Sequence, residues 1–428
     1  MKYPNGALLP HALQEKCRAA FCLVDTDENG NKRLFFDNSG GALRLAKCVE
    51  AKSKMEMLPD CPERTHEKAL ELRRVVEDGT RELLEIVFGA KEGAILTELT
   101  ASQAMFHLIE IVLENTEGGN AVVSAVEHPS AFDAVAYYCE RTGKELRVVY
   151  PDKEMGQITP ESVAALVDQD TRLVSVMSAS NVTGSVMDIP GIVQAVKAIN
   201  PDTYLISDAV QHAPHMALDV AGMGLDGSTF APYKFFGVRG CGFGYASPRL
   251  AALTHRKLLQ KPQEVFALGT PAPGNFAASH EIVAYVCEIG RYFSKETDTR
   301  ALFCEGMHRI HLHERALLHR LLEGSEKVPG LRHIEGVTVY TDTADLTRRD
   351  LIAAIGIEGL DFSECVKEYE KRGVIVCDRV LGSMYARRIL EALGLPGAIR
   401  VSPLHCHGEA DIDEFLRVTT AIAKAAKS

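Results

Sequence analysis

Residues able to do chemistry follow two short apolar segments in the middle of the chain. Asp208 and Gln211 come after the segment 204–207, and Lys234 comes after the segment 228–231. Both segments have the apolar character of buried strands, and in an open α/β sheet ligands bind at the carboxyl ends of the strands. We therefore expect the carboxylate of Asp208 and the amine of Lys234 to face one crevice.

An acid and a lysine in one crevice suit pyridoxal phosphate (PLP). The lysine would hold the aldehyde as a Schiff base, and the acid would keep the pyridine nitrogen protonated so that the ring withdraws electrons. A lysine that follows a strand is usually solvated, but the sequence around Lys234, FAPYKFFG, is apolar on both sides. Burial depresses the pKa of a lysine, which favours Schiff-base chemistry.

Three motifs of this region resemble a known family. DAVQ at 208–211, PH followed by DV within 214–220, and YKFFG at 233–237 resemble the class V aminotransferases, the PLP superfamily that includes the cysteine desulfurases, and most closely its desulfurase-like branch. The resemblance implies the α/β architecture of PLP fold type I, with a mostly parallel seven-stranded sheet in a large domain and a small C-terminal α/β domain. It divides the chain into an arm over 1–34 that packs with the small domain, a large domain over 35–290 and a small domain over 291–428.

The same resemblance implies which residues contact the cofactor. The segment TASQ at 100–103 corresponds to the phosphate loop of the family, and the free N–H groups of a helix start suit a phosphate. His128, in EHPS, would stack on the cofactor ring, and Asn181 and Gln211 would contact its phenolic oxygen. The expected cofactor contacts are Ala101, Ser102, His128, Asn181, Asp208, Gln211, Tyr233, Lys234 and Thr270, with Lys234 and His128 as catalytic residues.

Several of these motifs also have a structural interpretation. A hydroxyl at Thr100 or Ser102 caps many helices, and a histidine that follows a strand is often structural. The segment 181–184, NVTG, would also form a turn and matches a glycosylation sequon. Tyr233 would contact the phosphate or belong to the core. His215 is expected to pack.

Substrate and subunit contacts follow from three further segments. Arg400, in IRVSPLH, corresponds to the arginine that grips the substrate carboxylate, a role that suits a planar, bidentate guanidinium. Gly40 and Gly41, in FFDNSGG, would line the substrate pocket. Thr270, in GTPAP, would reach the phosphate site of the neighbouring subunit, which predicts a homodimer. The segment 405–407, HCH, indicates a surface turn rather than a metal site, because a third ligand is missing.

The cysteine that forms the persulfide in desulfurases is absent from its usual place. Counted back from Arg400, that place falls on Tyr385, and the desulfurase-like branch shares this tyrosine and Asp378. Cys377 is either a relocated nucleophile or a small hydrophobe at a strand end. We therefore expect a C–S lyase or an aminotransferase that acts at Cα or Cβ of an amino acid. A true cysteine desulfurase that uses Cys377 and a non-catalytic PLP-binding protein are the alternatives.

Composition narrows the class of protein. The chain of 428 residues suits a large and a small domain, and its net charge of −11 argues against a broad nucleic-acid surface. No apolar run approaches the ~20 residues that span a bilayer, and the first ten residues lack the apolar core of a signal peptide. The eleven cysteines include no CxxC pair, which fits a reducing compartment. We expect a cytoplasmic protein without a metal, a membrane partner or a nucleic-acid partner.

Overall fold

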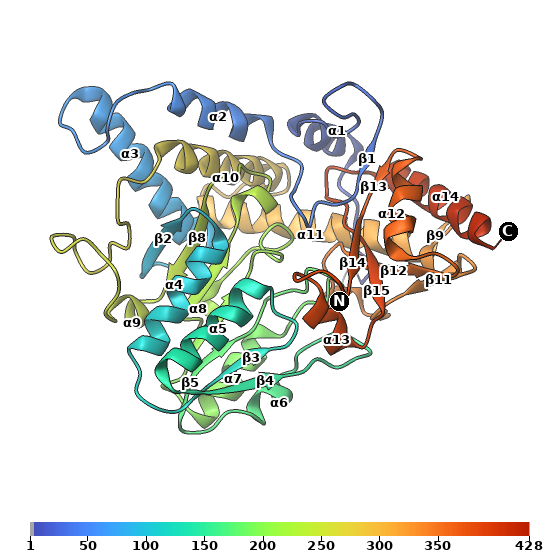
Figure 1. Cartoon of the computed structure of the whole chain (residues 1–428). Coiled ribbons are helices and arrows are strands. Elements are labelled where there is room, and N and C mark those ends of the chain that lie inside the picture. Colours follow the sequence, from blue (N-terminus) through green and yellow to red (C-terminus); the bar gives the residue numbers. More distant parts are fainter. Residues whose placement is uncertain (1–3, 428) are drawn as a thin grey trace.

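A seven-stranded sheet forms the centre of the larger part of the molecule (Figure 1). The structure is a computed structural model that describes residues 4–427. The strand order is β2-β8-β7-β6-β5-β3-β4, and β8 alone runs antiparallel to its neighbours. The strands are β2 (Ala94–Glu98), β3 (Asn120–Ser124), β4 (Glu145–Val149), β5 (Thr171–Ser175), β6 (Tyr204–Asp208), β7 (Gly227–Phe230) and β8 (Gly242–Ala246). The predicted mostly parallel seven-stranded sheet is confirmed.

Alternate residues of the central strands face two hydrophobic cores. Val122 and Val174 belong to one core, whereas their neighbours Val123 and Leu173 belong to the other. Strand side chains alternate with a period of two, so a sheet with two apolar faces needs helices on both. One face is covered by α4 (Ala101–Glu114) and α5 (Pro129–Thr142), and the other by α7 (Ile189–Ile199), α10 (Pro273–Phe293) and α11 (Thr299–Glu323). Shorter helices in the connections are α6 (Pro160–Ala164), α8 (Val220–Met223) and α9 (Pro248–Ala251).

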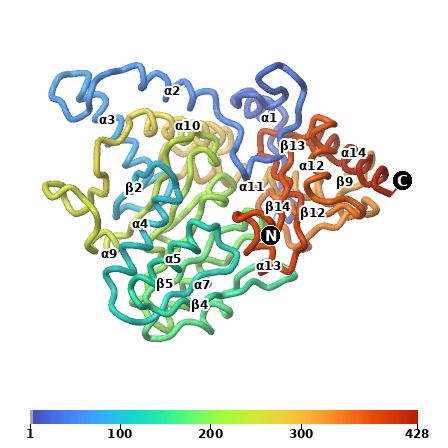
Figure 2. Tube along the Cα trace, in the orientation of Figure 1, coloured from blue at the N-terminus to red at the C-terminus, as the bar shows by residue number. Residues whose placement is uncertain are grey.

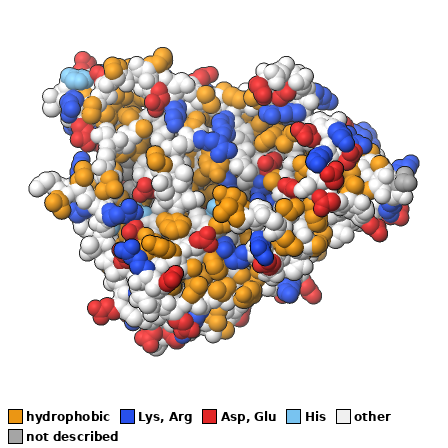
Figure 3. Space-filling model, viewed as in Figure 1, with side chains coloured by type: hydrophobic (Ala, Val, Ile, Leu, Met, Phe, Trp, Pro, Cys, Tyr) orange, Lys and Arg blue, Asp and Glu red, His pale blue; other side chains and the backbone are white. Residues whose placement is uncertain are grey.

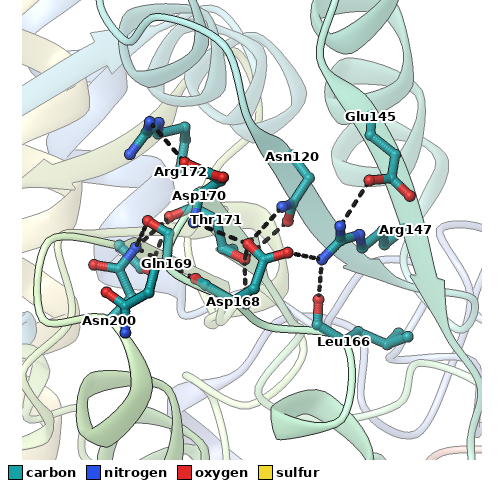
Figure 4. Close-up of polar contacts among 11 residues, drawn as sticks. Asn120, Glu145, Arg147, Leu166, Asp168, Gln169, Asp170, Thr171, Arg172 and Asn200 are labelled. Carbon is teal, nitrogen blue, oxygen red and sulfur yellow. Dashed lines mark hydrogen bonds and ion pairs between the residues drawn. The ribbon is translucent and has the colours of Figure 1, made fainter.

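A polar network ties the amino-terminal ends of three neighbouring strands together (Figure 4). Asp168, just before β5, accepts hydrogen bonds from Nη1 of Arg147 at 2.8 Å and from Nδ2 of Asn120 at 2.9 Å. Thr171 donates to Oδ1 of Asn120 at 2.8 Å. The bond from Arg147 is the main reason that the pKa of Asp168 falls to about 2. These contacts fix the edge of the sheet opposite to the strand ends that carry Asp208 and Lys234.

A second, four-stranded sheet lies in the C-terminal part of the chain. Its order is β11-β12-β15-β14, and every pair is antiparallel. Its strands are β11 (Val337–Val339), β12 (Ala353–Ile357), β14 (Cys377–Val380) and β15 (Gly397–Val401), and the accompanying helices are α12 (Phe362–Glu370), α13 (Arg387–Leu393) and α14 (Glu409–Ala426). Two short strands, β9 (Gly324–Ser325) and β10 (Val328–Pro329), pair with each other beside it.

Helix α11 belongs to both cores. Leu302 and Met307, near its start, pack in the core of the large sheet, whereas Leu317 and Leu321, in its second half, pack in the core of the small sheet. The helix therefore connects the two cores, with its first half packed in the large one and its second half in the small one. The boundary at residue 290 stays a prediction.

The N-terminal segment runs along one side of the molecule, drawn in blue in Figure 2. Helix α1 (His11–Ala20) contacts the C-terminal part through Arg18, whose Nη1 lies 2.7 Å from Oδ2 of Asp411. Phe21, just after α1, packs against Phe236 of the large core at 5.6 Å between ring centroids. Strand β1 (Leu34–Phe35) then pairs in parallel with β13 (Val374–Ile375), and α2 (Ala46–Glu56) and α3 (Glu67–Glu82) lie against α10.

Basic and acidic side chains are interspersed on the face shown in Figure 3. Within residues 4–427, no helix is long and apolar enough to cross a membrane. Each of the eleven cysteines is a free thiol.

Candidate functional site

A cavity of about 360 Å³ lies at the carboxyl ends of the central strands. The segments that follow β2, β3, β5, β6 and β7 form most of its wall, and the loop 239–241 completes it. Parallel strands bring their carboxyl ends to one edge, so residues far apart in sequence meet here. Eight predicted cofactor contacts line this cavity: Ala101, Ser102, His128, Asn181, Asp208, Gln211, Tyr233 and Lys234.

Lys234 is held at the cavity by a strained turn. It ends a short 3-10 helix that begins at Pro232 and is only 9% exposed. Phe236, two residues later, has φ of 62°, an uncommon conformation for a bulky residue. Its ring packs at 4.8 Å from His405 and 5.1 Å from Phe235, and this packing holds the turn. Burial lowers the pKa of Lys234 to about 8, with help from the Arg400 charge and against the pull of Asp208.

Asp208 is the last residue of β6 and is 7% exposed. Its Oδ1 accepts a hydrogen bond from the N–H of Val210 at 2.9 Å. Burial raises the pKa of Asp208, while the Val210 N–H and the Lys234 charge oppose that rise. A buried carboxylate of this kind gains from a cationic partner in the cavity.

Two side-chain amides in the cavity wall have unused hydrogen-bonding capacity. Oδ1 of Asn181 and Oε1 of Gln211 are buried and have no partner among the described residues. Buried polar atoms in native proteins are nearly always paired, and the oxygen and nitrogen of an amide can exchange places. Both side chains therefore fit a polar ligand in the cavity.

His128 caps the start of α5 and carries no charge near neutral pH. Its Nδ1 accepts a hydrogen bond from the N–H of Ser130 at 3.1 Å, which leaves the ring proton on Nε2. Burial, followed by the charges of Lys234, Arg379 and Arg388, lowers the pKa of His128 to about 4. The ring of Tyr385 lies against it, with centroids 5.8 Å apart and planes 27° apart.

The start of α4 forms one end of the cavity. Thr100 caps this helix, because its hydroxyl accepts the N–H of Gln103 at 3.1 Å, and Ala101 and Ser102 in the first turn line the cavity. A Cβ on Gly242 of β8 would overlap the backbone of Thr100 and Ala101. Only glycine therefore allows β8 to approach this helix start so closely.

Arg400 lies next to the cavity and links the two sheets. It is 3% exposed, its Nη2 is 2.5 Å from Oδ1 of Asp37, and its Nη1 donates to the carbonyl oxygen of Asn181 at 3.1 Å. A Cβ on Gly40 would lie 2.8 Å from a carboxylate oxygen of Asp37, and one on Gly41 would lie 2.6 Å from Nη2 of Arg239. The two glycines thus lie beside these charged groups.

A family model for the class-V aminotransferases matches residues 34–415. The chain belongs to this family. The family is PLP-dependent, and membership makes the chain an enzyme.

Curated relatives and solved structures agree with this membership. Aminotransferase-like protein FGM3 of Gibberella zeae is 26% identical over 344 residues, which cover 78% of this chain and 77% of that protein. A cysteine desulfurase of Cronobacter sakazakii is 23% identical over 347 residues, 74% of this chain and 79% of that protein. The apo structure of a cysteine desulfurase from Thermococcus onnurineus NA1 has a TM-score of 0.81 at 20% identity and covers 96% of this chain and 98% of its own. The Escherichia coli cysteine desulfurase CsdA has a TM-score of 0.76 at 17% identity, with the same coverage. The predicted fold type I is confirmed.

Thr270 lies away from the Lys234 cavity. It is exposed and borders a different cavity of about 680 Å³, which Arg73 and Phe266 also line. Thr270 therefore does not meet the other predicted cofactor contacts within this chain.

The predicted surface turn at residues 405–407 is wrong. His405, Cys406 and His407 are 0%, 3% and 1% exposed, because this segment packs beneath α1 and α11. His405 Nε2 lies 2.8 Å from the hydroxyl of Tyr285, and its backbone N–H donates to Glu314 at 3.2 Å. Within residues 4–427 no group of three or more His, Cys, Asp or Glu side chains has the arrangement of a metal site.

Three charged residues at the site were missed by sequence reasoning. Asp37 pairs with Arg400, and the guanidinium of Arg239 lies 4.3 Å above the ring of Tyr233. Arg379 follows Cys377 by two residues on β14 and lies near Lys234. Asp37 lies in the motif FFDNSGG and Arg239 in KFFGVRGCG. Roles were predicted for other residues of these motifs and for neither Asp37 nor Arg239. Arg379 could have been found from the strand period, because side chains two residues apart, such as Cys377 and Arg379, lie on the same face of a strand.

Proposed function

We propose that this chain is a PLP-dependent enzyme that acts at Cα or Cβ of an amino acid, as a C–S lyase or an aminotransferase. The observation that carries the proposal is the shared cavity of Lys234 and Asp208. A buried lysine with a lowered pKa and a buried carboxylate line one space, together with the start of α4. Perturbed pKa values in a cavity are typical of functional sites.

The residues of the cavity fit PLP. The free N–H groups at the start of α4, with Ala101 and Ser102, would hold its phosphate. Asp208 would pair with the ring nitrogen, and the amides of Asn181 and Gln211 would use their free capacity on the phenolic oxygen. His128 would stack on the ring, and Tyr233 would adjoin the phosphate. When bound, PLP supplies an electron sink that stabilises negative charge at Cα.

The remaining work falls to three side chains. Because its pKa is lowered to about 8, part of the Lys234 population is the neutral amine at neutral pH. This amine would move the proton at Cα. Arg400 would hold the α-carboxylate through its guanidinium, which is fixed by Asp37 and the Asn181 carbonyl. Gly40 and Gly41 would leave room for substrate beside these groups. Neutral His128, covered by Tyr385, would keep water from one side of the site.

Product analysis tests this function. Purified protein with PLP is given L-cysteine, cysteine conjugates and a panel of common amino acids, with and without 2-oxoglutarate as an acceptor of the amino group, and keto acid, sulfide and alanine are measured. Release of pyruvate with a thiol or sulfide indicates a lyase, and keto acid without loss of a side-chain group indicates an aminotransferase. Lys234→Ala should abolish either. Absence of turnover with every amino acid would favour a non-catalytic PLP-binding protein.

Cysteine desulfuration through Cys377 is the second candidate. Its supporting observation is position, because Cys377 lies directly opposite Arg400 in the β14–β15 ladder. Against it, burial raises the pKa of the Cys377 thiol, so the reactive thiolate is disfavoured. Conversion of cysteine to alanine that is lost in Cys377→Ser would establish this candidate, and unchanged conversion would remove it.

We further propose a homodimer in which Thr270 completes the phosphate site of the neighbouring subunit. The exposure of Thr270, away from the Lys234 cavity, supports a role in another subunit. Mixed dimers of Thr270→Ala and Lys234→Ala subunits separate the possibilities. A shared site predicts that the mixture regains PLP affinity at the site that retains Lys234, since its Thr270 comes from the other subunit. No recovery would contradict sharing.

A further inference from the structure

Three side chains of the small sheet share the face that borders the Lys234 cavity. Cys377 is the Cα partner of Arg400 in the antiparallel ladder, so the two side chains point to the same face. Arg379 is two residues from Cys377 on the same strand and therefore lies on that face as well. Diagonal neighbours of this kind are about 7–8 Å apart, within reach of long side chains. Two arginines thus stand side by side at the site.

Arg379 is a buried cation without an acidic partner. It is 8% exposed, and its Nη2 donates to the carbonyl oxygen of Tyr385 at 2.6 Å. Its Nε is buried and has no partner among the described residues, and no carboxylate in that part of the chain lies within ion-pair distance of it. Buried charges in proteins are almost always paired, so this guanidinium is incomplete as it stands.

Other arginines of the same region have more partners, although their Nε atoms are also buried without one among the described residues. Arg400 has Asp37, and Arg388 has Asp133 at 3.4 Å. Arg349, which is fully buried, donates to the carbonyl oxygens of Thr341, Thr183 and Ile352, and its Nη1 lies 3.9 Å from a carboxylate oxygen of Asp342. Arg379 differs from each of them in having no carboxylate partner: it donates to one carbonyl oxygen, that of Tyr385, and contacts the Cys377 thiol.

The site as a whole carries more positive than negative charge. Lys234, Arg379 and Arg400 stand near the carboxylates of Asp37 and Asp208, and Arg239 adds a further positive charge in the cavity wall. Burial and, after it, the positive charge of Arg400 lower the pKa of Arg379, because the two guanidinium groups repel each other. An α-carboxylate bound at Arg400 would still leave Arg379 without an acidic partner.

We propose that Arg379 binds a second anionic group on the substrate, so that the enzyme prefers amino acids whose side chain ends in a carboxylate or a phosphate-like group. This inference rests on the proposed function, because it assigns the α-carboxylate to Arg400. A bidentate guanidinium suits either kind of anion. Arg379 is the specificity residue, and Tyr385, whose carbonyl it holds, lies over His128 at the same side of the cavity.

Binding of unreactive acids to the PLP-loaded enzyme tests the proposal without turnover. The ligand pairs are succinate with succinamate and glutarate with glutaramate, in which an amide replaces one carboxylate, and 3-phosphonopropionate probes the phosphate-like group. Calorimetry should give dissociation constants about 10- to 100-fold lower for the better diacid than for its monoamide. Tighter binding of the phosphonate than of both diacids would assign the phosphate-like source, and the reverse order would assign the carboxylate.

Variants separate ligand binding from support of the Tyr385 segment. In Arg379→Gln the diacid advantage should fall to within about 3-fold, while monoamide binding stays unchanged. Arg387→Gln, which removes an exposed arginine eight residues away, should keep the wild-type ratio. Equal binding of diacid and monoamide by the wild type with no tighter binding of the phosphonate, or equal weakening of acid and amide in Arg379→Gln, overturns the proposal. The ratio of diacid to monoamide binding in the wild type is a test that does not depend on the folding of any variant.

The proposed function and this inference fail in different ways. A protein that shows no bound PLP in excess PLP refutes the proposed function. A protein that binds PLP and does not distinguish succinate from succinamate or glutarate from glutaramate, and binds the phosphonate no more tightly, refutes the role of Arg379 alone.

Discussion

Nη2 of Arg400 lies 2.5 Å from Oδ1 of Asp37, so the arginine proposed to bind substrate is already oriented by a carboxylate 363 residues away in sequence. Arg400→Lys should raise the KM for amino-acid substrates about 10- to 100-fold, because a lysine loses the bidentate fork. Asp37→Asn should have a smaller effect, since Nη1 still donates to the Asn181 carbonyl. Steady-state kinetics measures both. A larger loss in Asp37→Asn than in Arg400→Lys would assign substrate binding elsewhere.

Close packing of β8 on the start of α4 should govern phosphate binding. Gly242→Ala introduces a Cβ that overlaps the backbone of Ala101, and this overlap must move the helix start. We expect a PLP dissociation constant raised at least about tenfold, since the N–H groups lose their alignment. Gly244→Ala is the matched control, because its Cβ would meet nothing nearer than 3.4 Å. Equal PLP affinity in the two variants would show that the helix start does not hold phosphate.

The lowered pKa of Lys234 predicts how PLP uptake depends on pH. The amine form of lysine attacks an aldehyde and the ammonium form does not, so the rate of PLP uptake by the apoprotein should rise with pH and level off above a pKa of about 8. A solvated lysine would continue to rise toward about pH 10. Stopped-flow absorbance from pH 6.5 to 10 measures the rate. A profile without a plateau by pH 9.5 would contradict burial of Lys234 in the apoprotein.

A buried ion pair beneath the site predicts how stability depends on pH. Nδ1 of His215 lies 2.7 Å from Oε2 of Glu314. Burial opposes both charges, but the pairing outweighs it, raising the pKa of His215 to about 9 and lowering that of Glu314 to about 2. The contribution of His215 is complete below its unfolded pKa of about 6.5 and is lost as pH rises through about 9. The contribution of Glu314 is complete above about pH 4.3 and is lost as pH falls through about 2.

Substitution of Glu314 tests this pair. Glu314→Gln should lower the free energy of unfolding near pH 6.5 by about 3–5 kcal/mol, because it leaves a buried histidine without its partner. Glu391→Gln breaks an exposed pair with Arg387 and should change it by less than about 1 kcal/mol. Between pH 6.5 and 9 the wild type should lose stability while Glu314→Gln changes less. Thermal unfolding of the wild type and of the two variants measures these differences. Parallel curves of stability against pH for the wild type and Glu314→Gln would refute the pairing.

Local patterns in the sequence predicted the sheet and the cavity because both depend on strand ends. Asp208 and Lys234 follow apolar segments, and the carboxyl ends of parallel strands meet at one edge, so local pattern and resemblance together sufficed. The expectation for His215, packing, missed its ion pair with Glu314, which lies 99 residues away.

Contacts between distant segments escaped prediction. The partner of Arg400 lies 363 residues away, and the burial of residues 405–407 depends on α1 and α11, which no local pattern links to them. The resemblance to the desulfurases points to Cys377 and Tyr385 and not to Arg379, although the strand period puts Arg379 on the same face as Cys377.

The visible absorbance spectrum of the purified protein is the most direct test of the central claim, that Lys234 and Asp208 form a PLP site. Protein incubated with excess PLP and then freed of unbound cofactor should show an absorbance band that Lys234→Ala lacks. Asp208→Asn should change the band or its pH dependence. Addition of an amino-acid substrate should shift or bleach it. A wild-type spectrum without any bound-cofactor band, at a PLP concentration that saturates related enzymes, would contradict the account.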